Sequence, residues 1–416
     1  MGNFKRFFKK KVFLFLVFFF SLLLFYALSG LVFNNFSPNV AHSKNYDTSL
    51  DWTVLDGRYC SVIFPAGILI DYDTTYDHIA LHIANLADEV YSQITPQFGE
   101  PFHKNKRFTI ILEDFSDSAY GFATTMPHRL IRVNLTVPGP EIFDTKFESW
   151  LRILLAHEYT HLAHFDMTDK ITTFLHFFLG QIITPNALQP LWSIEGLAIY
   201  NESRLNTGGR LTDNRYEMYL RTDFMENSIK NPALLEGSYL VSWPGGNIPY
   251  IYGQSLVHYI ASHYGEEKLI AISEQFSSFP LSGMDWALKK ILGITQEELY
   301  QQWQEEKEHY FNQQIEQIIS AHKITESQQI TNHRYWVEKP SWIVDNTLQN
   351  TFLVYKVFTP HLYPTIRKYN LNSQKESVVV KRTAGLGTSY SFSPDSQYLL
   401  YSKLVQYDQY YSYQDL

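Results

Sequence analysis

The chain has 416 residues, which is enough for two or three domains. Its 45% hydrophobic and 18% charged residues are typical of a folded protein and exclude a largely disordered chain. The formal net charge of −8 argues against general nucleic-acid binding, and a single cysteine, Cys60, excludes an intrachain disulfide.

The N-terminus resembles a targeting segment. Five basic residues between Lys5 and Lys11 precede an apolar run from Val12 to Phe33. This run is long for a signal peptide and just long enough to span a bilayer, so residues 1–33 fit either a cleaved signal or a retained anchor. Positive charge before the run keeps that end cytoplasmic, so we expect export of the rest to the periplasm or cell envelope. Residues 34–56 are polar and are predicted to form a linker.

Three strands and one helix are predicted ahead of the central motif. Apolar runs at Tyr59–Phe64, Arg107–Leu112 and Arg129–Val137 indicate strands. Apolar residues at three- and four-residue steps from Ile79 to Ile94 predict a helix that ends before Pro96. The third strand is expected either to line a cleft and pair with an extended peptide, or to be an ordinary sheet strand.

The central motif is His157-Glu158-Tyr159-Thr160-His161, within Leu151–Asp166. Regularly spaced leucines and the absence of proline and glycine predict a helix here. Residues four apart share one helix face, so both imidazoles can bind one zinc ion, and Glu158 can act as general base on its open side. The alternative is a buried helix with polar groups satisfied by neighbours, but burying two histidines and a glutamate without a partner is costly.

A third metal ligand is predicted at Glu195, which lies among apolar residues in Pro190–Tyr200. A carboxylate in such surroundings requires a partner, and a metal ion is the strongest one. The alternative is a partly exposed helix glutamate. His164 is a rival ligand, but it lies about 10.5 Å further along the helix axis than His157, too far to share a metal with it. We therefore expect His164 either to support a metal ligand from behind or to have a structural role.

The rest of the chain divides into a helical and a strand-rich part. The apolar stretch Ile171–Ile183 is too short to cross a membrane and is predicted to be a core helix or a membrane-touching surface. Further helices follow from Tyr250, and a capping box at Thr295–Glu298 opens a long helix to about Ile319. These elements close a first folded unit, residues 57–322.

From about residue 330 the pattern switches to short strands separated by turn residues. Leu386–Ser402, two strands around a Ser-Pro-Asp turn, fits the edge of a propeller blade. Only about two blades fit before Leu416, whereas a propeller needs at least four, so a partial propeller is expected. The alternative is a small β-appendage.

These motifs together resemble a known family. The pair His157–His161 and Trp192-x-x-Glu195-Gly196-Leu197-Ala198 is similar to the gluzincin metallopeptidases of clan MA, the thermolysin-like zincins. Gly121-Phe122-Ala123, Tyr252-Gly253-Gln254 and Tyr264–Lys268 resemble the exported peptidase MA-like domains, and Phe392–Asp395 resembles the TolB-like propeller repeat. The resemblance covers Tyr59–Ile319 and Arg334–Leu416, and it implies an α+β fold of a small sheet plus a helical bundle.

The resemblance also implies roles for single residues. Zinc would be held by His157, His161 and Glu195, with Glu158 as the base that activates water. A downstream tyrosine often stabilises the oxyanion, and Tyr252 is the expected donor with Tyr250 as its substitute. The spacing from His161 to Glu195 is longer than in thermolysin, and no aspartate stands four residues after Glu195 to orient a zinc histidine. The absence of a Gly-x-Met-Glu-Asn stretch argues against classical aminopeptidase specificity.

The expected function is an exported zinc metallopeptidase that cleaves peptides or proteins at the cell envelope, with membrane association through residues 12–33 and no nucleic-acid partner. The alternative is a non-catalytic binding or scaffold protein that uses a peptidase-like domain and a propeller to hold protein partners. A third hypothesis is a truncated, non-functional product, since the propeller stops early.

Overall fold

A computed structural model of the chain describes residues 47, 49–68, 75–99, 107–138, 147–181, 183–205, 208–239, 242–321, 325–333, 335–345, 350–385, 388–407 and 411–416. Residues 50–407 and 411–416 form one compact unit. The predicted signal or anchor, residues 1–33, lies outside the described residues. Among the described helices, none is long and apolar enough to cross a membrane.

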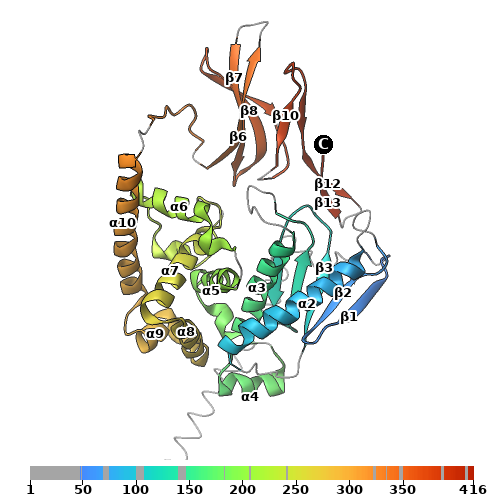
Figure 1. Ribbon diagram of the computed structural model, residues 1–416, viewed down its shortest axis with the longest axis vertical. Coiled ribbons are helices and arrows are strands. Elements are labelled where there is room, and N and C mark those ends of the chain that lie inside the picture. The colour runs from blue at the N-terminus through green and yellow to red at the C-terminus, as the bar shows by residue number, and fades with distance from the viewer. Residues whose placement is uncertain are drawn as a thin grey trace, which may run out of the picture. The chain divides into compact units, whose positions relative to one another are not determined.

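A five-stranded mixed sheet forms the first layer of the fold (Figure 1), in the order β1-β2-β3-β5-β4. The central pairs β2–β3 and β3–β5 are parallel, whereas β1 and β4 are antiparallel edge strands. The three predicted strands are confirmed, but the last five residues of the predicted linker form an extra strand instead, because they pair with β2. The strands are β1 (Trp52–Asp56), β2 (Cys60–Pro65), β3 (Phe108–Glu113), β4 (Gly121–Thr124) and β5 (Leu130–Asn134).

Two helices cover one face of this sheet. The predicted helix before Pro96 is α2 (Tyr76–Ile94), and the motif helix is α3 (Phe147–Phe165). Their apolar stripes meet the inward side chains of β2, β3 and β5 in one buried core, which includes Ile83, Ile110 and Leu151. The three- and four-residue spacing of apolar residues in the sequence thus marks the helix faces that are buried against the sheet.

A helical bundle with its own core follows. Its centre is Trp192, Tyr252 and Trp303, all almost fully buried. The predicted capping box is confirmed, because Thr295 N donates to Glu298 Oε2 at 2.7 Å and Glu298 N donates to Thr295 Oγ1 at 3.1 Å. The helices are α4 (Lys170–Leu179), α5 (Leu191–Arg204), α6 (Asn214–Met225), α7 (Ile248–Tyr264), α8 (Glu266–Ser278), α9 (Gly283–Ile291) and α10 (Gln296–Ala321).

Helices α5 and α7 cross in backbone contact. A methyl group on Gly196 would lie 2.5 Å from the carbonyl oxygen of Gly253, and one on Gly253 would lie 2.4 Å from the carbonyl oxygen of Trp192. Neither position has room for a side chain. Glycine at both positions therefore lets the two helices approach more closely than ordinary side chains permit.

The C-terminal part contains the predicted strands but not the predicted propeller. Four strands form one antiparallel meander, and the remaining four pair as two separate hairpins, so none of the described sheets closes. The hairpin of β12 and β13 contacts the loop after β3, where the Tyr413 hydroxyl donates to the carbonyl of Asp114 at 2.6 Å. The strands are β6 (Trp336–Asp345), β7 (Asn350–Thr359), β8 (Leu362–Asn370), β9 (Lys375–Val380), β10 (Tyr390–Phe392), β11 (Leu399–Tyr401), β12 (Lys403–Tyr407) and β13 (Tyr411–Asp415).

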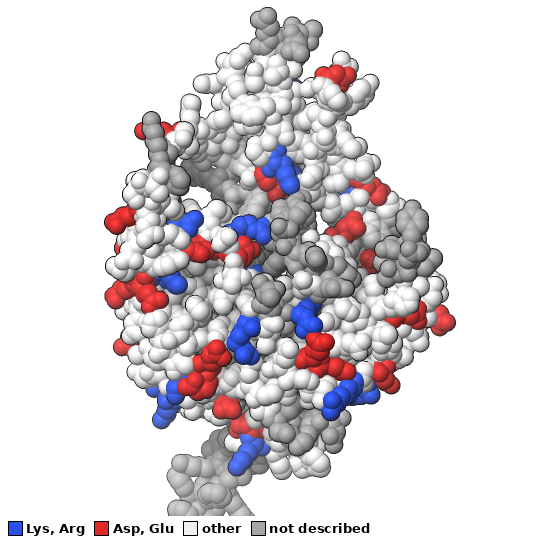
Figure 2. All heavy atoms as spheres, viewed as in Figure 1, with Lys and Arg blue, Asp and Glu red and all other residues white. Residues whose placement is uncertain are grey.

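Charge is dispersed over the surface. Figure 2 shows acidic and basic side chains intermingled across the visible face of the molecule, with no broad basic area among the described residues there. On this face, therefore, neither sign of charge forms a field of its own among the described residues.

The crossing of α5 and α7 predicts a large effect of one methyl group. Gly196→Ala should lower the free energy of unfolding by about 3 kcal/mol, because the new Cβ overlaps the backbone of Gly253. Urea denaturation followed by circular dichroism measures the change. Gly385→Ala is the matched control, since nothing lies within 4 Å of a Cβ built there, and it should stay close to the parent. Equal stability of both variants would contradict the packing argument.

Candidate metal centre

Helix α3 presents two histidines on its face toward α5. His157 and His161 lie one turn apart and are 6% and 7% exposed, so neither ring is a surface group. Their Nε2 atoms lie 3.1 Å from each other. The opposite face of α3 is buried in the sheet core, which holds the helix in place. The pair is therefore rigidly positioned, as the sequence predicted.

Glu195, from α5, completes the group. Its Oε2 atom lies 3.3 Å from Nε2 of His157 and 3.5 Å from Nε2 of His161. Three ligands at about 2.1 Å from one tetrahedral zinc ion would be separated by about 3.4 Å. The Oε2 atom is buried and no hydrogen-bond donor with good geometry faces it among the described residues. The distances between the three atoms thus match ligands of one shared cation better than they match hydrogen bonds among the three side chains.

Glu158 lies beside the histidines and under strand β4. It is 6% exposed, and burial raises the pKa of its carboxyl group. A methyl group on Gly121 of β4 would lie 2.8 Å from Oε1 of Glu158 and 2.7 Å from Leu154. The backbone of β4 therefore runs directly over the predicted base, and the Gly-Phe-Ala stretch begins with glycine because no side chain fits there.

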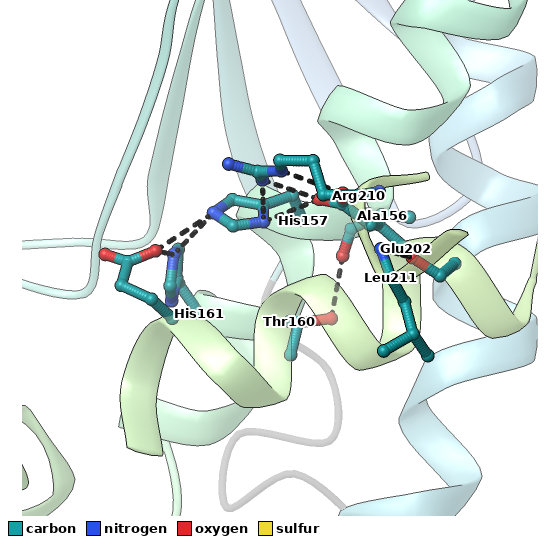
Figure 3. A network of polar contacts seen from close by, with 9 residues as sticks. Ala156, His157, Thr160, His161, Glu202, Arg210 and Leu211 are labelled. Carbon is teal, nitrogen blue, oxygen red and sulfur yellow. Dashed lines mark hydrogen bonds and ion pairs between the residues drawn. The ribbon is translucent and has the colours of Figure 1, made fainter. Parts of the chain in front are cut away.

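Two further residues orient His157, and neither was found from the sequence. Nδ1 of His157 donates to Oε2 of Glu202 at 2.8 Å (Figure 3). Arg210, at the start of η3 (Arg210–Thr212), donates to the same carboxylate from Nε at 2.9 Å and from Nη2 at 2.6 Å. Its Nη2 also lies 2.7 Å from Nδ1 of His157, but both atoms are donors when Glu202 is the acceptor, so that contact is not a hydrogen bond. Glu202 fixes the tautomer that leaves Nε2 free for a metal.

Glu202 takes the place of the orienting aspartate that is missing four residues after Glu195. It lies seven residues after Glu195, two turns along α5, and is fully buried. The spacing of seven residues, which places Glu195 and Glu202 on the same face of the helix, was the available signal. Despite burial, the charge of Arg210 and the hydrogen bonds from Arg210 and His157 lower the pKa of Glu202 to about 2, so this carboxylate is ionised.

Opposing effects set the basicity of His157. Burial and the charge of Arg210 lower its pKa, but the carboxylates of Glu195 and Glu202 outweigh them and raise the pKa to about 9. The two carboxylates thus make His157 a strong electron donor. Because a metal ligand must be deprotonated, binding of a cation at this site displaces a proton at neutral pH.

The two tyrosines of α7 are placed opposite to expectation. The hydroxyl of Tyr252 donates to Asp223 Oδ2 at 2.6 Å and accepts from Lys230 N at 3.1 Å in the core of the bundle, so the predicted oxyanion role of Tyr252 is wrong. Tyr250 lies at the site instead. Its hydroxyl is hydrogen-bonded to Glu195, and the guanidinium of Arg210 lies 5.5 Å from its ring centre. Burial and Glu195 raise the pKa of Tyr250, so it remains a proton donor.

Other histidines near the motif have structural partners. Nε2 of His164 lies 2.9 Å from Oγ of Ser273 on α8, and burial lowers the pKa of His164 to about 3. Nε2 of His176 lies 2.7 Å from the carbonyl oxygen of Ile183 and donates to it. Neither residue joins the group around Glu195. For His164, the distance along the helix predicted this.

The edge of the sheet at the site is β4. The expectation that the strand Arg129–Val137 forms the cleft edge is wrong, because β5 lies between β3 and β4 and its backbone groups are used on both sides. Strand β4 pairs with β5 alone among the described strands. Its outer edge therefore carries the backbone groups that remain available beside Glu158.

Comparisons with known proteins give little beyond this geometry. No family model matches the chain. An uncharacterised protein of Treponema pallidum (strain Nichols) is 32% identical over 187 residues, 45% of this chain but only 16% of that protein. An M1 zinc metallopeptidase from Deinococcus radiodurans is similar with a TM-score of 0.32 at 15% identity, covering 61% of this chain and 51% of that one. A mutant of that enzyme bound to a Tyr-Ser-Ala substrate gives a TM-score of 0.30 at 14% identity over the same shares.

Glu202 yields a direct prediction about metal affinity. Glu202→Gln removes the charge that holds the tautomer of His157 but leaves the three predicted ligands in place, so zinc binding should weaken about 10- to 100-fold. Competition with a chromophoric chelator measures the affinity. Glu274→Gln, an exposed glutamate on α8, is the control and should bind zinc like the parent. Unchanged affinity in Glu202→Gln would contradict the orienting role.

Proposed function

We propose that this chain is an exported zinc metallopeptidase of the gluzincin type, which hydrolyses peptide bonds. The observation that carries the proposal is the convergence of His157, His161 and Glu195 on one point with Glu158 beside it. Two histidines and a carboxylate with an adjacent free glutamate form the ligand set of hydrolytic zinc sites, whereas structural zinc sites use four protein ligands.

The residues of the site have separable roles in this reaction. Zinc, when bound, supplies Lewis-acid activation of a water molecule and of the substrate carbonyl. Glu158 takes the proton of the attacking water and passes it to the leaving amine, a role that its raised pKa favours. Tyr250 donates its hydroxyl proton toward the oxygen on which negative charge develops. Glu202 and Arg210 hold the imidazole of His157 in one orientation.

The substrate is proposed to bind as an extra strand on the outer edge of β4. An extended peptide gains main-chain hydrogen bonds from this edge, which lies over Glu158. Phe122 of β4 is 52% exposed and is available to contact substrate side chains. In this binding mode the enzyme recognises mainly the main chain of the peptide, so it would accept substrates of many sequences.

The cellular setting remains a proposal from the N-terminal sequence. The basic segment and the apolar run of residues 12–33 support export, either as a secreted protein or as one held at the membrane. The C-terminal sheets offer strand edges for protein partners.

The role of Glu158 gives the first test. Glu158→Gln should lower the rate of hydrolysis of a casein-type substrate at least about 100-fold while zinc content stays at one per chain, because the amide cannot accept the proton. His161→Ala should instead lose the zinc itself, as measured by elemental analysis. A zinc-loaded parent that cleaves no member of a broad peptide library would refute the peptidase and leave a binding protein.

The tyrosines give the second test. Tyr250→Phe should lower kcat about 100-fold with little change in KM, because the hydroxyl acts on the developing charge. Tyr252→Phe is the matched control on the same helix. It should keep kcat but lower the free energy of unfolding by about 1–2 kcal/mol, since Asp223 and Lys230 lose a buried partner. The reverse pattern would restore Tyr252 as the donor.

A further inference from the structure

Helix α4 carries a continuous apolar surface. Phe177 is 82%, Ile171 68%, Phe178 65% and Phe174 61% exposed, the largest such group on any described helix. Their spacing places them on one face, and the rings of Phe174 and Phe177 lie 5.0 and 5.1 Å from that of Phe178. Together they expose roughly 500 Å² of apolar surface, more than isolated surface residues account for. We call these four residues the α4 face.

The opposite side of α4 is fixed to the protein. Thr172 and His176 are buried, and His176 donates to the carbonyl of Ile183. The side chain of Asp169 caps the helix by accepting from Thr172 N at 2.8 Å. The helix is thus well anchored on one side, and its exposed face is not the result of a loosely attached segment.

The composition of the α4 face fits lipid better than protein. Interfaces between proteins carry about one hydrogen bond per 100–200 Å² and a polar rim. The α4 face offers only aliphatic and aromatic groups, and the one exposed polar group of the helix beside it is the ammonium of Lys170. Residues 170–179 contain no acid, and a basic residue at the rim of an aromatic surface matches anionic headgroups.

The N-terminal sequence, which lies outside the described residues, is the reason to expect a bilayer near the folded unit. Residues 12–33 form an apolar run long enough to span a membrane, and the folded unit begins at Leu50. The intervening residues 34–49 can extend at most roughly 55 Å. A chain held by this run therefore keeps its folded unit close to a membrane surface at all times, which raises the effective concentration of lipid around α4.

We propose that the α4 face, with Lys170 at its rim, docks the folded unit onto an anionic lipid surface, with the four apolar side chains about 5–10 Å into the headgroup boundary. This contact is independent of catalysis. It is a second attachment that orients the folded unit, in addition to the predicted anchor.

A single-cysteine experiment on the full chain tests the proposal. Cys60 is fully buried, so a thiol introduced by Phe177→Cys can be labelled selectively with an environment-sensitive fluorophore. The labelled chain is reconstituted into phosphatidylcholine–phosphatidylglycerol vesicles with or without brominated acyl chains. Brominated lipid should lower the fluorescence at least twofold. Phe174→Cys should respond in the same way, because it lies on the same face.

The control label is Met225→Cys on α6, a helical position that is 55% exposed and apolar. It should show no quenching by brominated lipid. Labels at 177 and 174 that stay as water-exposed as this control would overturn the proposal, since the anchor alone would then hold the chain. A signal that depends on protein density and not on bromination would also overturn it, in favour of a second copy of the chain. Zinc content and hydrolysis are not needed for either outcome.

Discussion

The backbone contact between α5 and α7 is the constraint on which the site depends. Gly196 and Gly253 leave no space for side chains where these helices cross. Glu195 is the neighbour of Gly196, and Tyr250 lies one turn before Gly253, so the depth of the crossing sets how far both side chains reach toward the histidines of α3. A wider crossing would withdraw the proposed metal ligand and the proposed proton donor together. The glycine of the Trp192–Ala198 motif is therefore a packing requirement.

Electrostatics explains why the site suits a cation. Glu158, Glu195 and Glu202 are all largely buried within one small region, and their mutual repulsion and desolvation oppose folding. Glu202 is satisfied by Arg210, which donates to it from two nitrogen atoms. Among the described residues, imidazoles and the hydroxyl of Tyr250 surround the carboxylate of Glu195. Despite burial, the imidazoles of His161 and His157 hold the pKa of Glu195 well below its usual range, and a divalent ion shared with the two histidines would take over this role from their protons.

The sequence predicted the parts of the site that follow from local periodicity. His157, His161 and Glu158 share one helix, so their relation is set by the helical repeat, and Glu195 stood out as an acid within an apolar helix. The sequence could not show which of Tyr250 and Tyr252 faces the site. Residues two positions apart on a helix point to nearly opposite sides, and only the partners Asp223 and Lys230 show which side is the core. Glu202, Arg210 and the order of the sheet depend on contacts between distant segments, which no local pattern contains. The β-strands after residue 334 were predictable from turn spacing. How these strands pair into sheets was not, because the pairing depends on contacts between strands.

The connection between α3 and α4 links the metal centre to the apolar face. Asp166, one residue after α3, is buried and forms an ion pair with Arg129 beside the sheet, and it accepts from Nε2 of Gln181, two residues after α4, at 2.8 Å. Gln181 thereby ties the C-terminal end of α4 to the residue that follows the helix carrying His157 and His161. Because this tie is partly buried and Thr172 and His176 are buried on the inner side of α4, the angle between the α4 face and the β4 edge is fixed by the fold and not by a flexible linker. A unit docked through α4 would therefore present its substrate edge to the membrane in a single orientation, and that orientation would limit which peptide segments reach Glu158.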